Sequence, residues 1–328
     1  MTSASGPEID TPSLKIVAAV RRGDVRSCAR LITQIEAGDP STHPILRVLY
    51  LAGGRTPIIG ITGPPGAGKS TLVDYLITRY RARALKVAVL AIDPASPFTG
   101  GAILGDRVRM ARHNTDEGVF IRSMSARGML GGLARAAGDA LIVLDAMGQD
   151  VILVETVGVG QNEIDIMRHA RSVLIVQTPA AGDVIQAVKA GVLEIGDVFA
   201  VNKADGDGAD RAVSTLREAV EFRNDPHDPN AWHPPIVKTQ CTDGMGIDEL
   251  LAALDGHATY LRTHPQALRS RQLTQARIRL HELVSEGLQR RYSVATESGP
   301  KVSALLDDLV ERRCDPHSAA LRVLDDMS

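Results

Sequence analysis

The sequence has few aromatic residues and almost no net charge. Aromatic side chains make up 3% of the 328 residues, which argues against a stacking platform for single-stranded nucleic acid. Lysine and arginine number 37 against 39 aspartates and glutamates, so the basic excess typical of nucleic-acid binders is missing. We therefore expect no nucleic-acid partner. Because 44% of the residues are hydrophobic, we expect a folded protein.

Long apolar runs and paired cysteines are missing too. No stretch of about 18 apolar residues occurs, so we expect no membrane contact through a spanning helix. The first residues have neither a basic end nor an apolar segment, and they predict no secretory signal. Cys28, Cys241 and Cys314 lie far apart and form no C-x-x-C pair, which indicates a cytoplasmic protein in a reducing compartment.

The order of the apolar patterns predicts three parts. Residues 1–55 show helical periodicity, with a stop and a new N-cap at Gly23 and Asp24. Residues 56–255 alternate short β-branched runs with helix-length segments, which predicts a mainly parallel sheet covered on both faces. We expect this part to be a three-layer α/β domain. Residues 256–328 contain no strand-like run and predict a helical arm.

One face of the long helix predicted over about residues 270–291 is apolar. The positions on this face recur at helical spacing and are Leu273, Ala276, Leu280, Leu283, Val284 and Leu288. Because the α/β domain is complete without this arm, we expect a second copy of the chain to cover the face in a homodimer. The alternative is that the arm packs on its own α/β domain.

A phosphate-binding motif follows the first strand-like run. The pattern G-x-x-x-x-G-K-[ST] is matched at every fixed position, between an apolar strand and a helix pattern. In such a P-loop the backbone N–H groups bind phosphate oxygens, Lys69 reaches the β- and γ-phosphates, and the Ser70 hydroxyl binds Mg²⁺. We expect nucleotide contacts from Gly63, Pro64, Pro65, Gly66, Ala67, Gly68, Lys69, Ser70 and Thr71.

A second motif, N-K-x-D, ends the apolar strand 198–202. An ionised Asp205 only accepts hydrogen bonds, and guanine offers it two adjacent donors where adenine offers an acceptor. Sites built on such pairing discriminate by roughly 10⁴–10⁵, so the motif predicts GTP and GDP as ligands. We expect Asn202 to tie this loop to the phosphate loop and the stem of Lys203 to lie along the base.

The loop after the last strand-like run is expected to close over the guanine. It consists of Gln240, Cys241 and Thr242, where GTPases usually have a Ser-Ala-type pair. Backbone N–H groups of this loop can still contact the base. We interpret Cys241 as a small buried residue, with a redox switch as the alternative.

Carboxylates at the ends of two further strands are candidate magnesium ligands. Glu155 stands three residues before Gly158, where most GTPases have Asp-x-x-Gly. The N–H of Gly158 would bond the γ-phosphate. Asp93 and Asp106 flank a glycine-rich loop that Mg²⁺ and the γ-phosphate would order, the alternative being solvated acids at a capped turn. With Ser70, these three carboxylates form the predicted metal site.

No glutamine directly follows Gly158 to orient the attacking water. Gln161 is a candidate for that role, and Lys189 is a candidate cation, with a solvated helix lysine as the alternative. We expect slow intrinsic hydrolysis, because a supplied cation contributes about 10³–10⁵ in rate in other GTPases. The candidate catalytic residues are Lys69, Asp93, Asp106, Glu155, Gln161 and Lys189.

Two blocks of the sequence are more specific than the P-loop. Residues 93–106 (DPASPFTGGAILGD) and 154–163 (VETVGVGQNE) closely resemble the G-protein chaperones of methylmalonyl-CoA mutase. This family has also been labelled a lysine/arginine/ornithine (LAO/AO) transport ATPase or kinase. The resemblance runs from about Leu14 to beyond Arg290. It implies a homodimeric GTPase that binds the adenosylcobalamin-dependent mutase and couples GTP binding and hydrolysis to cofactor loading, protection or reactivation.

The resemblance also assigns a role to residues 177–191, as a third switch that contacts the mutase. It thereby favours Asp183 and Lys189 as functional residues, and it makes the glutamate at position 155 typical of the family. Other functions stay open: a nickel metallochaperone GTPase, although the chain has no C-x-x-C or histidine-rich tract, and a small-molecule kinase or transport ATPase, against which Asp205 argues. An interaction module without nucleotide chemistry is disfavoured, because every phosphate-contact position is filled.

Overall fold

The structure is a computed structural model that describes residues 10–54, 56–93, 110–113, 115–125, 132–156, 167–179, 192–221, 228, 231–297 and 300–326. The chain forms two compact units, Met1–Gln275 and Ala276–Ser328. Within the ranges described, no helix combines the length and the apolar character needed to cross a bilayer.

Three helices precede the sheet. They are α1 (Thr11–Arg21), α2 (Val25–Glu36) and α3 (His43–Ala52), with the 3-10 turn η1 (Pro40–Thr42) before α3. The carboxylates of Asp10 and Asp24 cap the first two, accepting from the N–H groups of Ser13 at 2.9 Å and Ser27 at 2.7 Å. Gly23 has a φ of 78°, which ends α1 where the sequence predicted a stop.

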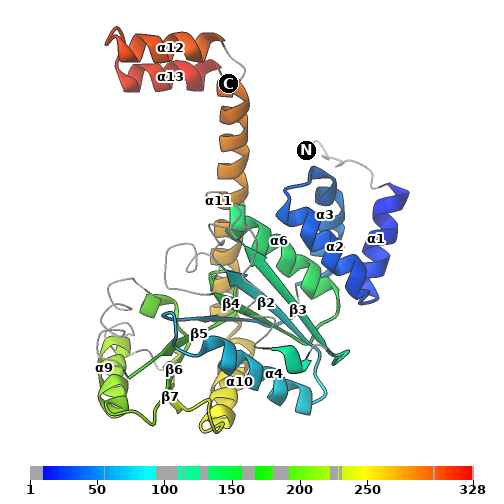
Figure 1. Cartoon of the computed structure of the whole chain (residues 1–328), viewed down its shortest axis with the longest axis vertical. Helices are drawn as coiled ribbons and strands as arrows, with labels where there is room; N and C mark the ends of the chain where they lie inside the picture. Colours follow the sequence, from blue (N-terminus) through cyan, green and yellow to red (C-terminus); the bar gives the residue numbers. More distant parts are fainter. Residues whose placement is uncertain are drawn as a thin grey trace. The chain divides into compact units, whose positions relative to one another are not determined.

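Seven strands form one sheet in the order β3-β2-β4-β1-β5-β6-β7, and every described pairing between them is parallel (Figure 1). The strands are β1 (Ile58–Thr62), β2 (Val87–Asp93), β3 (Val119–Ser125), β4 (Val151–Thr156), β5 (Ser172–Gln177), β6 (Val198–Asn202) and β7 (Ile236–Thr239). Ile61 of β1 lies opposite both Glu155 and Leu174, so β1 is flanked by β4 and β5. The strand order reverses there, which places a ligand crevice at the carboxyl end of β1.

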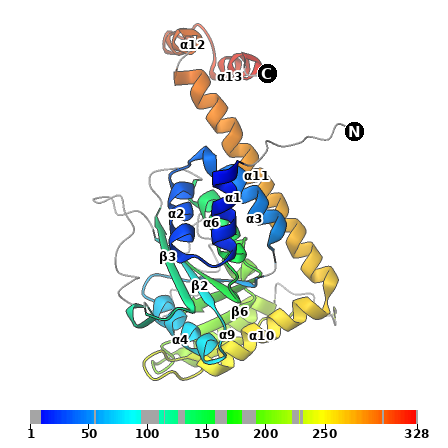
Figure 2. The ribbon, with the colours of Figure 1, turned by 90° about the vertical axis from the view of Figure 1, so that its right-hand side faces the viewer.

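Helices cover both faces of the sheet. They are α4 (Lys69–Ala82), α6 (Gly132–Ala146), α9 (Ala209–Glu221) and α10 (Ile247–Thr263), with 3-10 turns η2 (Ala111–His113) and η3 (Val192–Ile195). The apolar sides of α4 and α10 share one core with the strands, and those of α6, α9 and the three N-terminal helices share the other. Figure 2 shows α6 beside α1, α2 and α3. The predicted three-layer α/β architecture is confirmed.

The C-terminal helices are α11 (Pro265–Glu297), α12 (Pro300–Val310) and α13 (Pro316–Asp326). The helix predicted over residues 270–291 is present and longer, because a proline suits its first turn and α12 starts anew at Pro300. In the second unit, Leu280, Leu283, Val284 and Leu288 of α11 are exposed. The assignment of residues 1–55, 56–255 and 256–328 to separate functional parts stays a prediction.

Candidate nucleotide site

The phosphate-binding loop joins β1 to α4 at the centre of the sheet. Gly63 and Gly68 have φ values of 151° and 89°, which side chains rarely adopt. A Cβ at Gly63 would overlap the carbonyl oxygen of Val176, and one at Gly68 would overlap the side-chain amide of Asn202. The loop therefore packs directly against β5 on one side and against the predicted base loop on the other.

Lys69 begins α4, and its side chain folds back over the loop. The ammonium Nζ donates to the carbonyl oxygens of Gly63 at 2.8 Å and Pro64 at 3.0 Å. The residue is 6% exposed, so its charge sits inside the loop at the helix N-terminus. A buried cation beside the N-terminus of a helix is an arrangement that binds phosphate.

Ser70 and Glu155 are 85 residues apart in sequence and in contact in the structure. The Ser70 hydroxyl donates to Oε1 of Glu155 at 2.6 Å, and the two residues are 6% and 3% exposed. A hydroxyl and a carboxylate are the hard oxygen donors that Mg²⁺ prefers, and Mg²⁺ typically takes one or two carboxylates plus phosphate oxygens. Two of the four predicted metal ligands are thus brought together, and their chemistry fits Mg²⁺. Over the described part of the chain, no three His, Cys, Asp or Glu residues gather in a metal-binding group.

The Asn202 side chain joins the base loop to the phosphate loop, as the sequence predicted. Its Nδ2 donates to the carbonyl oxygen of Ala67 at 2.7 Å. Its Oδ1 accepts from the Thr239 hydroxyl and from the Cys241 thiol, both at 3.2 Å. Asn202 is 1% exposed, so this link is shielded from water.

The residues after Asn202 form a tight loop. Lys203 has a φ of 59°, a left-handed conformation that is strained for a residue with a side chain. The N–H of Ala204 donates to the carbonyl oxygen of Thr239 at 3.1 Å, and that of Gly206 donates to Lys203 at 3.2 Å. These bonds hold the loop in place while the Asp205 side chain stays exposed and accessible to a base.

The loop after β7 is closed by its own hydrogen bonds. The N–H of Gly244 donates to the carbonyl oxygen of Gln240 at 3.0 Å, and Nε2 of Gln240 donates to the Thr242 hydroxyl at 3.1 Å. Cys241 is half-buried. Burial raises the pKa of its thiol from 9.0 to about 11. The thiol is therefore protonated at neutral pH.

Several predicted residues cannot be placed in this site. Asp106, Gly158, Gln161, Asp183 and Lys189 lie outside the described residues, together with most of the third-switch segment. The backbone of Asp93 ends β2, opposite Ser125 of β3, but its side chain is not described. Pro65, Gly66 and Thr71 are exposed on the loop and the first turn of α4.

Thr239 is a residue of the site that sequence reasoning missed. It is fully buried, and its hydroxyl and carbonyl oxygen contact Asn202 and Ala204 respectively. The signal was a hydroxyl residue at the last position of the last strand, directly before the predicted closing loop. A buried polar side chain at a parallel strand's carboxyl end needs a partner, and the neighbouring base loop provides it.

Comparisons with known proteins agree with this geometry. The family Methylmalonyl Co-A mutase-associated GTPase MeaB matches residues 28–297. A putative GTPase of Pyrococcus abyssi is 44% identical, covering 94% of this chain and 95% of its own length. GTPase ArgK of Escherichia coli is 35% identical over 75% of this chain and 76% of its own length.

Two further similarities extend this result. The mitochondrial methylmalonic aciduria type A homolog of Caenorhabditis elegans is 33% identical, covering 75% of this chain and 66% of its own length. A crystal structure titled LAO/AO transport system kinase superposes with a TM-score of 0.70 at 23% identity, covering 98% and 99% of the two chains, and supports the fold. The extent of the family match and the identity to these relatives show that the chain is a GTPase of the methylmalonyl-CoA mutase-associated family.

Proposed function

We propose that this GTPase acts as a chaperone of an adenosylcobalamin-dependent methylmalonyl-CoA mutase. It couples GTP binding and hydrolysis to loading, protection or reactivation of the mutase cofactor. Membership of the family and the name of the nematode relative support the mutase as partner. The free cysteines are in keeping with a cytoplasmic setting.

The observation that carries the nucleotide part of the proposal is the hydrogen bond from Asn202 to Ala67. It connects a loop suited to phosphate with a loop that presents the exposed carboxylate of Asp205. A guanine nucleotide held by its phosphates on the first loop would meet Asp205 with N1–H and its 2-amino group. Gln240, Cys241 and Thr242 would close over the same base with backbone N–H groups.

Mg²⁺ is the metal that the Ser70 hydroxyl and the Glu155 carboxylate fit, with Asp93 and Asp106 as further proposed ligands. When bound, the ion would offset the negative charge of the phosphates. Lys69 would bind the same phosphates, after its ammonium exchanges the two loop carbonyls for stronger anionic acceptors.

We further propose that the chain works as a homodimer through its C-terminal arm. The exposed apolar residues Leu280, Leu283, Val284 and Leu288 stand at positions i, i+3, i+4 and i+8 of α11, which is the spacing of one helix face. A second copy of this helix is the partner we propose for that face. Slow intrinsic turnover is expected in this scheme, with Gln161 and Lys189 as candidates for positioning the water and supplying the cation.

The proposal is tested by GTP turnover with and without the purified mutase. We expect the mutase to form a complex with the chain in the presence of a non-hydrolysable GTP analogue and to change the turnover rate. Identical rates and no complex would contradict the chaperone role, but the assignment of the chain as a GTPase would be unaffected. A sedimentation measurement of the chain alone tests the dimer, with Leu283→Glu and Leu288→Glu as the variants that should give monomers.

A further inference from the structure

The side-chain amide of Asn202 can adopt two orientations, and only one of them joins the two nucleotide-binding loops. In the observed orientation Nδ2 donates to the carbonyl oxygen of Ala67 at 2.7 Å. In the reversed orientation Oδ1 would face that carbonyl, and two acceptors would oppose each other. The surroundings of the amide therefore decide how firmly the base loop is attached to the phosphate loop.

Two donors surround Oδ1 in the observed orientation. The Thr239 hydroxyl and the Cys241 thiol both lie 3.2 Å away, the first at the end of β7 and the second two residues beyond it. A hydroxyl can donate or accept, so Thr239 does not by itself select an orientation, and the Ala67 carbonyl and a donor at position 241 are what favour the observed one. A thiol sulfur is a poor acceptor, and an amide NH₂ turned toward Cys241 would be left poorly satisfied.

We propose that Cys241 is a positioning residue of the guanine site. Its S–H group holds Oδ1 of Asn202 and thereby keeps Nδ2 on the phosphate loop. The inference rests on the proposed guanine site. It concerns the side chain of Cys241, whereas the sequence predicted a contact only from the backbone of this loop. Cys241 acts through Asn202 and needs no contact of its thiol with the nucleotide.

The environment of the thiol suits this role. Its pKa of about 11, raised by burial, keeps the proton on sulfur throughout the neutral range, so the donor is always available. Asn202 itself is 1% exposed, so water does not compete for Oδ1. A side chain without a donor at position 241 would remove one of the two described donors to Oδ1, and the amide would be held less firmly in the observed orientation.

The test compares Cys241→Ala with Cys241→Ser, which restores a donor. The measured quantities are the dissociation constant and dissociation rate of Mg²⁺–GDP, with far-ultraviolet circular dichroism to confirm folding. One hydrogen bond to a neutral partner corresponds to an effect of about threefold to tenfold. We expect Cys241→Ala to bind GDP that much more weakly, mainly through faster release, and Cys241→Ser to recover most of the loss. Cys314→Ala makes the same chemical change in the second unit and should bind like the wild type.

A double-mutant cycle with Asn202→Ala separates positioning from a general effect on the loop. If Cys241 acts through Asn202, Cys241→Ala has no further effect on GDP affinity in the Asn202→Ala protein. The inference is overturned if the two changes add, if Cys241→Ala binds GDP like the wild type, or if Cys241→Ser is as weak as Cys241→Ala. Wild-type protein that binds no guanine nucleotide would instead overturn the proposed site itself.

Discussion

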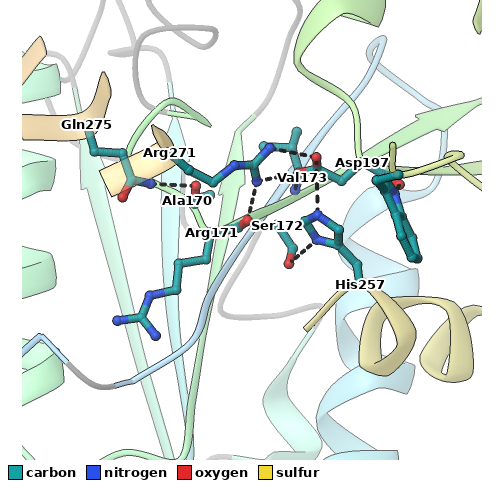
Figure 3. Close-up of polar contacts among 9 residues, drawn as sticks. Ala170, Arg171, Ser172, Val173, Asp197, His257, Arg271 and Gln275 are labelled. Atoms are coloured by element: carbon teal, nitrogen blue, oxygen red, sulfur yellow. Dashed lines mark hydrogen bonds and ion pairs between the residues drawn. The ribbon is translucent and has the colours of Figure 1, made fainter. Parts of the chain in front are cut away.

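The two ends of β5 carry polar clusters of opposite design. Beside its carboxyl end, the hydrogen bonds around Asn202 join neutral groups, and the nearby carboxylate of Asp205 is exposed. At its amino end, shown in Figure 3, Asp197 binds the Arg271 guanidinium through two hydrogen bonds of 2.6 and 2.7 Å. The same carboxylate accepts from the N–H of Val173 at 2.8 Å, and Asp197 is 3% exposed.

The cluster at the amino end joins Asp197 to residues of β5, α10 and α11. His257 Nε2 lies 3.5 Å from Asp197, and its Nδ1 lies 2.8 Å from the Ser172 hydroxyl. The three residues have the types of a hydrolase triad, yet none is more than 4% exposed, so a substrate could not reach them. One end of the sheet thus keeps its carboxylate accessible to a ligand, whereas the other uses its carboxylate to fasten the first turns of α11 to the strands.

Among the substitutions that test this contrast, we expect Asp205→Asn to have the largest effect, on the preference for guanine nucleotides. An asparagine presents a donor as well as an acceptor, so one of the two guanine donors loses its partner and the charge is lost. The preference for GTP over ATP should fall by at least about a hundredfold, against the 10⁴–10⁵ available to such sites. Calorimetry with Mg²⁺ and each nucleotide measures the change.

The thermal stability of the nucleotide-free Asp205→Asn protein serves as the control. Because the Asp205 side chain is exposed, the unfolding midpoint should stay that of the wild type. An unchanged nucleotide preference would contradict the assignment of Asp205 and favour the kinase or transport-ATPase alternative.

At the amino end of β5 we expect a substitution to lower stability and to leave nucleotide binding unchanged. Asp197→Ala leaves the Arg271 guanidinium, 28% exposed, without its carboxylate partner and removes the acceptor for Val173. Breaking a buried ion pair typically costs 3–5 kcal/mol, so we expect a loss of about 3 kcal/mol in the free energy of unfolding. Urea denaturation measures it. Nucleotide affinity of the folded protein should stay within about twofold, since the two clusters share no side chain.

Asp197→Asn is the matched variant, because it keeps an acceptor for Val173 and removes the charge. If it is as stable as the wild type, the ion pair with Arg271 contributes nothing and the hydrogen bond alone matters. If Asp197→Ala weakened GDP binding as strongly as Asp205→Asn, the separation between the two ends of the sheet would be wrong.

The carboxyl end of the sheet was predictable from sequence, because its residues stand in contiguous motifs. Lys69, Ser70 and Asn202 could be assigned contacts since strand ends of a parallel sheet meet at one edge, and the bonds of Ser70 to Glu155 and of Asn202 to Ala67 are present. The bond of Cys241 to Asn202 was not predictable, because it depends on how two loops approach each other.

The amino end was not predictable by the same reasoning. Ser172, Asp197, His257 and Arg271 belong to no motif, and their separations in sequence reach from 14 to 99 residues. Each residue alone suggests a solvated surface side chain. Only the packing of α10 and α11 on the strands makes the carboxylate of Asp197 a common partner for His257 and Arg271, with Ser172 joined through His257.

A smaller effect should come from Gln275→Ala, which tests whether neutral bonds at the amino end matter as the ionic ones do. Nε2 of Gln275 donates to the carbonyl oxygen of Ala170 at 2.7 Å. A single neutral hydrogen bond contributes about 1 kcal/mol, so the loss in unfolding free energy should be about a third of that for Asp197→Ala. Urea denaturation of both variants under one condition makes the comparison. Equal losses would mean that the charge of Asp197 is not what fastens α11.

The smallest effect concerns pH and brings the comparison back to the carboxyl end. Because the fold raises the pKa of the Cys241 thiol from 9.0 to about 11, the folded chain keeps its proton at pH values where the unfolded chain has lost it. The stabilising contribution of the protonated thiol is therefore complete below pH 9 and lost as the pH rises toward 11.

The comparison of the wild type with Cys241→Ser tests this expectation. In Cys241→Ser this loss is absent, so the difference in unfolding free energy between the wild type and the variant should shrink or change sign over that window. Cys28, whose pKa burial raises to about 12, is present in both proteins and cancels. A difference that stays constant from pH 8 to pH 11 would show that the thiol is not held in the protonated, donating form on which the link to Asn202 depends.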